Sequence, residues 1–225
     1  VQWGTLVGVL IYFWRDLWEI VRGVVLGLAH RRPFETPAAR MGWYIVLGTL
    51  PAVMFGFFLK DAFEAAFGMP MAVAALLLGT AAILAAAERL GRRERTTRDL
   101  GWLDALLVGM WQVIALLPGI SRSGSTISGA MLRSFDRRSA ARFSFLLSVP
   151  ALLGAGVVAI SDLLKAGNLV ANLPALVIGF VAAAISGYLC ICWLLAYLQR
   201  RSLIVFAVYC AFFGLFCLAV ALIRG

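Results

Sequence analysis

The chain has 225 residues, of which 63% are hydrophobic and 14% are charged. Its mean hydropathy is +0.95, whereas a typical soluble domain contains only about 45–50% apolar residues. This composition excludes a soluble globular enzyme and a disordered chain. The net charge of +9, from 20 Lys and Arg against 11 Asp and Glu, is typical of a membrane protein with basic cytoplasmic loops. We therefore expect an all-α polytopic membrane protein, and we expect no nucleic-acid partner.

The first apolar run, Val1–Trp14, has 14 residues, fewer than the roughly 20 that cross a bilayer. A mature protein does not normally begin inside a span, so we expect further residues before this run. Gly4 and Gly8 within it have the spacing that indicates close helix packing. The next segment, Asp16–Leu28, mixes charged and apolar side chains and predicts an amphipathic helix lying in the membrane interface.

Six more apolar segments follow, most of them long enough to cross a membrane. They are Met41–Leu59, Met69–Ala87, Trp102–Leu117, Phe143–Ile160, Pro174–Leu198 and Leu203–Ile223. The loops between them fall into two classes by their basic residues. Arginines gather in residues 15–40, 88–100, 136–142 and 199–202, whereas residues 60–68 and 161–173 each hold one lysine and no arginine.

The arginine-rich loops should all face the cytoplasm. If residues 102–135 crossed the membrane once, every later loop would break this rule. A segment that enters and returns to the same side satisfies it throughout. As a helix, Trp102–Leu117 would be about 24 Å long and the return limb, Ile127–Phe135, shorter, against a core of about 30 Å. We predict a re-entrant helical hairpin over residues 102–135, within one integral membrane domain over residues 1–225.

The tip of this hairpin is polar and contains an arginine. It runs Pro118-Gly119-Ile-Ser121-Arg122-Ser123-Gly124-Ser125-Thr126. Pro118 and Gly119 stop the incoming helix, and Ser125 or Thr126 can cap the outgoing one. Irregular backbone at membrane depth survives only when it is buried in protein or lines a polar cavity. The tip is therefore expected to be internal.

Arg122 is the residue in this tip that points most directly to function. An arginine near the bilayer centre costs at least about 2.5–3.5 kcal/mol, so it requires a partner. A guanidinium beside hydroxyls and a helix N-terminus describes a phosphate site. The alternative is that Arg122 binds backbone carbonyls and pins the broken helix. Gln112, six residues before Pro118, either contacts the ligand or makes an interhelical hydrogen bond.

Four runs of sequence, in two parts of the chain, resemble a known family. Gly109-Met-Trp-Gln112-Val-Ile-Ala-Leu-Leu-Pro118-Gly119-Ile-Ser121-Arg122-Ser123-Gly124-Ser125-Thr126, followed by Asp136-Arg-Arg-Ser-Ala-Ala-Arg142-Phe-Ser-Phe, closely resembles the undecaprenyl-pyrophosphate phosphatase, or bacitracin-resistance, family. Val1-Gln2-Trp3-Gly4 and Ile11-Tyr12-Phe13-Trp14 are similar to a second stretch of that family. The resemblance implies a membrane phosphatase with an inverted repeat and two re-entrant hairpins.

The implied reaction removes the terminal phosphate of a C55 polyprenyl diphosphate in the bacterial plasma (inner) membrane. The product returns to cell-wall synthesis, and the activity confers bacitracin resistance. The site would open to the outer, periplasmic face. By resemblance, Arg122 and Ser121 are catalytic. The implied substrate-binding residues are Gly119, Gln112, Ser123, Gly124, Ser125 and Thr126.

The resemblance also implies a divalent cation, Mg or Ca, and leaves a homodimer open. The family's acidic motif and histidine would lie before Val1, so we expect no metal ligand in this chain. His30, the single histidine, lies in a basic linker and is expected to be an interfacial residue. These 225 residues would then carry half an active site and turn over little substrate alone.

Two other classes of function fit the same residues. A lipid or anion transporter also binds its substrate with broken helices near the midplane. A non-catalytic lipid-binding protein would follow if the chain truly begins at Val1.

Overall fold

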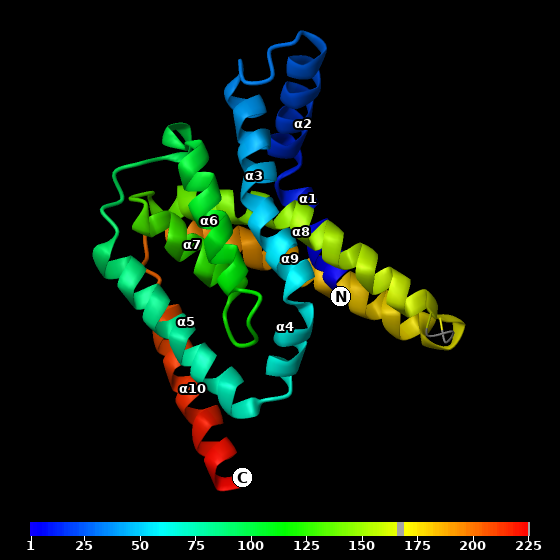
Figure 1. The fold of residues 1–225 in the computed structure, drawn as a ribbon, viewed down its shortest axis with the longest axis vertical. Coiled ribbons are helices and arrows are strands. Elements are labelled where there is room, and N and C mark those ends of the chain that lie inside the picture. The colour runs from blue at the N-terminus through cyan, green and yellow to red at the C-terminus, as the bar shows by residue number, and fades with distance from the viewer. Residues whose placement is uncertain (166–168, 225) are drawn as a thin grey trace. The chain divides into compact units, whose positions relative to one another are not determined.

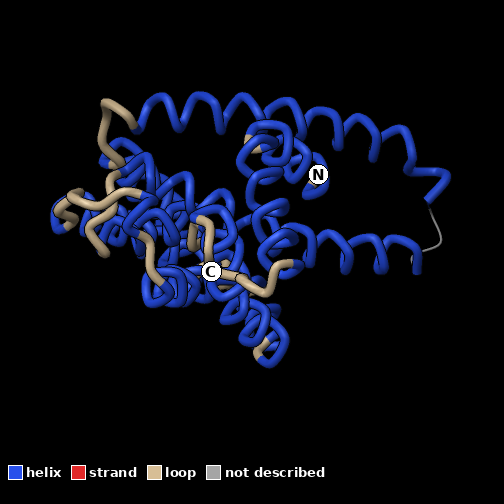
Figure 2. The backbone as a smooth tube through the Cα atoms, turned by 90° about the horizontal axis from the view of Figure 1, so that it is seen from above, coloured by secondary structure: helices blue, strands red, loops and turns tan. Residues whose placement is uncertain are grey.

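The computed structural model describes residues 1–165 and 169–224. In this part of the chain, Figure 2 shows helices and loops and no strand. The helices are α1 (Gln2–Tyr12), α2 (Trp14–Ala29), α3 (Pro37–Phe58), α4 (Lys60–Phe67), α5 (Pro70–Leu90), the short 3-10 helix η1 (Thr97–Asp99), α6 (Trp102–Ile114), α7 (Arg122–Leu132), α8 (Arg137–Lys165), α9 (Leu169–Leu198) and α10 (Ile204–Arg224).

Among the described residues, 5 helices are long and apolar enough to cross a membrane. These candidate spans are Pro37–Phe58, Pro70–Leu90, Arg137–Ser161, Leu173–Leu198 and Ile204–Ile223. The prediction of an all-α polytopic membrane protein is therefore confirmed.

Several helix ends differ from the prediction by three to six residues, and one helix was not predicted. α8 begins at Arg137 rather than at Phe143, because Asp136 accepts a hydrogen bond from the Ser139 N–H at 2.9 Å and so caps the helix. Residues 60–67, expected in a loop, form α4. Its sequence is rich in alanine, with glutamate and lysine, all strong helix formers.

The chain divides into two compact units. The first unit consists of Val1–Ile45 with Phe145–Tyr197, and the second of Val46–Ser144 with Leu198–Gly225. Every residue predicted to act in the functional site lies in the second unit.

In the first unit, α1 packs closely on α9 through its two glycines. A Cβ added at Gly4 would lie 2.2 Å from the Phe180 carbonyl oxygen, and one at Gly8 would lie 2.8 Å from the Ala184 carbonyl oxygen. The spacing of these glycines therefore predicted the contact correctly. In addition, Trp3 of α1 donates from Nε1 to the carbonyl of Gly156 in α8 at 2.9 Å.

α2 leaves a stripe of large apolar side chains exposed along the helix. The stripe consists of Trp14, Trp18, Val21, Val25 and Leu28, each more than half exposed. They recur every three or four residues, so they share one face. The charged residues Arg15, Glu19 and Arg22 lie between them in the sequence. This pattern is that of an amphipathic helix.

In the second unit, α5 and α10 lie side by side (Figure 1). α6 and α7 pack against each other, and α7 also packs on α5. Their shared core is apolar: Ala105, Val108, Ile127 and Met131 are at most 2% exposed. This core holds α6 and α7 in place beside α5.

Candidate functional site

α6 and α7 are too short to cross a bilayer. With 13 and 11 residues, they extend about 20 Å and about 17 Å at 1.5 Å per residue. Gly129 lets the two helices approach closely, because a Cβ there would lie 2.3 Å from Cδ1 of Trp111. Figure 1 shows them as neighbours joined by a loop.

The open ends of α6 and α7 meet at a buried carboxylate. Asp104, 2% exposed, accepts hydrogen bonds from Arg95 Nη2 at 2.6 Å and Arg133 Nε at 2.8 Å. It also accepts one from the Gly101 N–H at 3.0 Å. Since Gly101 precedes α6 and Arg133 follows α7, the segment returns to where it began. The predicted helical hairpin is therefore present.

The charge of Asp104 also acts on its partner in the loop. The hydrogen bond with Asp104 raises the pKa of the Arg95 guanidinium above its usual value. The Arg95 guanidinium lies 4.4 Å from the ring centroid of Phe135, the last residue of the hairpin, close enough for a cation–π contact. Backbone hydrogen bonds join the same two segments: the Arg95 N–H donates to the Ser134 carbonyl, and the Asp136 N–H to the Arg95 carbonyl.

At the tip, the chain turns at Gly119 and restarts as a helix at Arg122. Gly119 has φ +93°, a conformation that favours glycine. Ser121 caps α7, since its Oγ accepts the Gly124 N–H at 3.2 Å. The expectation that Ser125 or Thr126 caps this helix is wrong, because Ser121 has the extended backbone that a cap requires. The return helix consequently begins five residues before the predicted Ile127.

The hydroxyls of Ser125 and Thr126 bond within the protein, and both residues are 1% exposed. Ser125 Oγ donates to the Trp111 carbonyl at 2.7 Å. Thr126 Oγ1 lies 2.9 Å from the Arg122 carbonyl and 2.5 Å from Ser144 Oγ of α8. These two side chains tie the return helix to its neighbours. By contrast, Ser121, Arg122 and Ser123 are only half-buried.

Arg122 is paired with Gln112, the residue that the sequence placed on the incoming helix. Arg122 Nη2 donates to Gln112 Oε1 at 3.2 Å. Gln112 is 2% exposed, and its Nε2 has no hydrogen-bond partner among the described residues. A buried donor left unpaired costs about 1–3 kcal/mol. A ligand oxygen at the tip could therefore bind Arg122, this amide and the first turn of α7 together.

Comparison with known proteins identifies the family. A model of the bacitracin resistance protein BacA family matches residues 1–216. The chain belongs to this family. It is 48% identical over 210 residues to an undecaprenyl-diphosphatase of Anaeromyxobacter sp. (strain K), covering 93% of this chain and 71% of that relative. An undecaprenyl-diphosphatase of Thermomicrobium roseum is 44% identical over 224 residues, covering 96% of this chain and 81% of the relative.

The buried carboxylates that the structure describes in this BacA-family chain are held by arginines. Among the side chains that the structure describes, no three His, Cys, Asp or Glu lie close enough to share a metal ion. Asp104 is held by its two arginines. Glu88, at the end of α5, accepts from Arg93 at 2.6 Å and from the Leu203 N–H at 3.1 Å, and also pairs with Arg137. Both buried carboxylates are thus occupied by cationic side chains, and we assign no step to a metal.

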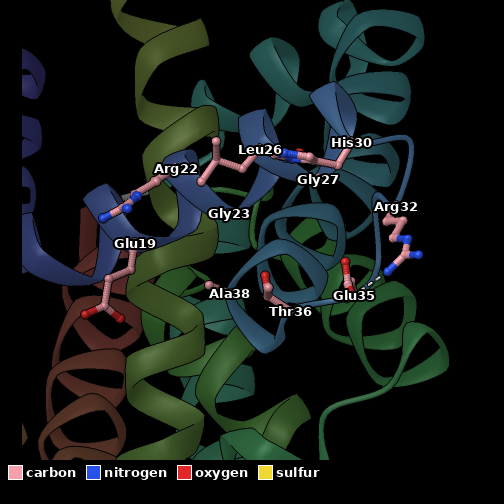
Figure 3. Close-up of a pocket in the computed structure, with 10 residues that line it drawn as sticks. All are labelled: Glu19, Arg22, Gly23, Leu26, Gly27, His30, Arg32, Glu35, Thr36 and Ala38. Atoms are coloured by element: carbon pink, nitrogen blue, oxygen red, sulfur yellow. Dashed lines mark hydrogen bonds and ion pairs between the residues drawn. The ribbon is translucent and has the colours of Figure 1, made fainter.

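A groove of about 410 Å³ lies in the first unit of this BacA-family chain, between α2 and the start of α3 (Figure 3). Two arginines and two glutamates line it, and Arg32 pairs with Glu35 at 3.1 Å. His30 also lines it, exposed, with Nδ1 2.8 Å from the Leu26 carbonyl. The groove contains no residue of the hairpin tip.

Two hydroxyl side chains that hydrogen-bond to the tip were not predicted from the sequence: Ser144 of α8 and Thr80 of α5. Thr80 Oγ1 accepts the Ser121 N–H at 3.1 Å and donates to the Gly119 carbonyl at 3.0 Å. Thr80 is the one side chain with a hydroxyl in the apolar run Met69–Ala87. A polar side chain isolated in a span indicates a function or a partner, and this signal could have identified it.

Proposed function

We propose that this chain hydrolyses undecaprenyl diphosphate to undecaprenyl phosphate and inorganic phosphate. Water adds to the terminal phosphorus, and the bond from that phosphorus to the bridging oxygen breaks. The lipid keeps one phosphate and returns to use as the cell-wall carrier. Membership of the bacitracin resistance protein BacA family supports the proposal, as do relatives named undecaprenyl-diphosphatase at 41–48% identity.

The observation that carries the proposal is the arginine–glutamine pair at the start of α7. Phosphoryl transfer is catalysed mainly by positioning and by stabilising charge on the phosphoryl oxygens. We propose that Arg122 offsets this charge in the transition state and that Gln112 supplies a further donor through Nε2. Ser121 and Ser123 would contact the phosphates, with Gly119 and Gly124 shaping the turn. Ser125 and Thr126 would act mainly by holding α7 in place.

We also propose that the protein lies in the bacterial inner membrane with its substrate site open to the periplasm. The arginine-rich loops support this orientation, because cytoplasmic loops carry an excess of Lys and Arg. The open end of the hairpin adjoins residues 88–100 and 136–142, both of them basic. Its tip would therefore lie on the periplasmic side of that end.

A second candidate is transport of a lipid or anion, since transporters also place helix N-termini at their substrates. Two assays on the purified full-length protein separate the functions. In detergent, a C15 or C55 diphosphate is added with and without Mg or Ca, and phosphate release is followed. In sealed vesicles, movement of the same lipid across the bilayer is measured. Hydrolysis predicts phosphate release in detergent, where no gradient exists. Movement of intact diphosphate without any release would overturn the phosphatase proposal.

A further inference from the structure

The hairpin tip rests directly on α5. A Cβ added at Gly119 would lie 2.3 Å from the carbonyl oxygen of Val73 and 3.2 Å from the backbone nitrogen of Leu77. Further along α5, a Cβ added at Gly79 would lie 3.6 Å from Cδ1 of Ile120. The irregular backbone between α6 and α7 therefore has α5 as its support.

At the centre of this contact, one hydroxyl satisfies two backbone groups of the tip. Thr80 is 1% exposed. Its Oγ1 accepts the Ser121 N–H at 3.1 Å and donates to the Gly119 carbonyl at 3.0 Å. The carbonyl of Leu76 in its own helix is more distant, at 3.4 Å. A hydroxyl has one proton to donate, and the shorter distance favours Gly119.

These two bonds fix the backbone on both sides of Ile120. Ser121 is the cap of α7, so its backbone sets where the helix begins and where Arg122 starts. Without the hydroxyl, the Ser121 N–H and the Gly119 carbonyl, both half-buried, would lose these partners, and the tip would shift to find others. A displacement of about 1 Å at a reacting centre can lower the rate about 100-fold.

We infer that Thr80 is a positioning residue of the phosphate site, which holds the tip of the hairpin so that Ser121 and Arg122 meet the diphosphate. The inference rests on the proposed function. It assigns to α5 a part in the reaction, although Thr80 itself touches no reacting atom.

The test compares two substitutions that separate the hydroxyl from the shape. Thr80→Val keeps the volume and removes the hydroxyl, whereas Thr80→Ser keeps the hydroxyl. Thr5→Val in α1 is the matched control. The Thr5 hydroxyl donates to the carbonyl of Val1, four residues earlier in the chain, and this hydrogen bond is exposed. Each full-length variant is assayed for phosphate release from a C15 diphosphate, per mole of folded protein, alongside its thermal melt.

We expect Thr80→Val to lower kcat about 10- to 100-fold with KM changed by less than about threefold. Thr80→Ser and Thr5→Val should stay within about threefold of the unsubstituted protein. If the valine variant keeps full kcat, or if serine fails to rescue it, the inference is overturned. A loss of kcat that merely follows loss of folded protein would also overturn it.

A second measurement does not depend on turnover. Amide hydrogen exchange of the peptide covering residues 116–124 should become about tenfold faster in Thr80→Val, because the Ser121 N–H loses its acceptor. Unchanged exchange would overturn the inference. If the unsubstituted protein releases no phosphate, the proposed function fails instead, and the exchange comparison still decides whether Thr80 holds the tip.

Discussion

The pairing of Arg122 with a neutral amide makes Gln112→Glu the most informative single substitution. The change adds a negative charge at the position of Oε1, 3.2 Å from Arg122 Nη2. At that separation and an effective dielectric constant of about 20, opposite unit charges attract by roughly 5 kcal/mol. A diphosphate would have to displace this internal anion before Arg122 could bind it. Gln112→Leu adds no charge: it removes the hydrogen bond to Arg122, worth about 1.5–3 kcal/mol, together with the Nε2 donor proposed for the phosphate.

The two variants should therefore rank differently by activity and by stability. We expect Gln112→Leu to lower kcat/KM for a C15 diphosphate by roughly 10- to 150-fold and Gln112→Glu by more. The new ion pair should nevertheless give the glutamate variant a melting temperature at or above that of the leucine variant. Phosphate release and thermal melts of both detergent-purified variants test this. If the Gln112→Glu variant were as active as the Gln112→Leu variant, or more active, the assignment of Arg122 to the anion would be refuted.

Two further predictions concern the hairpin scaffold and are measured as melting temperatures, for which about 1 kcal/mol corresponds to about 2–4 °C in a chain of this length. Asp104→Asn should lower the free energy of unfolding by about 2 kcal/mol. This is less than the roughly 3–5 kcal/mol lost when a fully buried ion pair is broken, because Arg95 and Arg133 are 30% and 43% exposed. Asp99→Asn, at an exposed carboxylate, is the control and should change the melting temperature little. Gly129→Ala should lower the free energy of unfolding by about 1–3 kcal/mol, since the added Cβ would meet Trp111. Gly154→Ala is its control: a Cβ there would meet no described atom within 4 Å, so the change should be neutral or slightly stabilising. Equal effects within either pair would contradict the packing described.

The elements of the fold could be predicted from the sequence because they depend on local composition. Long apolar runs identified the spans, and the alternation of arginine-rich loops predicted the hairpin. α4 was missed because it is only 8 residues long, below the length at which a pattern is distinctive.

The residues of the candidate site could be proposed from the sequence only where they share one motif. The run from Gln112 to Thr126 brought the arginine, the glutamine and the hydroxyls into view together. It did not show which hydroxyls face a ligand: Ser125 and Thr126 turn toward Trp111 and Ser144. Nor did it reveal Thr80, 41 residues before the amide that it binds. Partners so distant along the chain leave no local pattern.

The central claim is that Arg122 stabilises the charge of a diphosphate at the start of α7. The most direct test is phosphate release from a C15 diphosphate by the full-length protein carrying Arg122→Ala, with Arg122→Lys beside it and folded protein quantified by thermal melt. We predict that alanine lowers kcat about 100- to 1,000-fold and that lysine restores part of it, because lysine keeps the charge but not the planar fork. Release by the alanine variant at the rate of the unsubstituted protein would contradict the account.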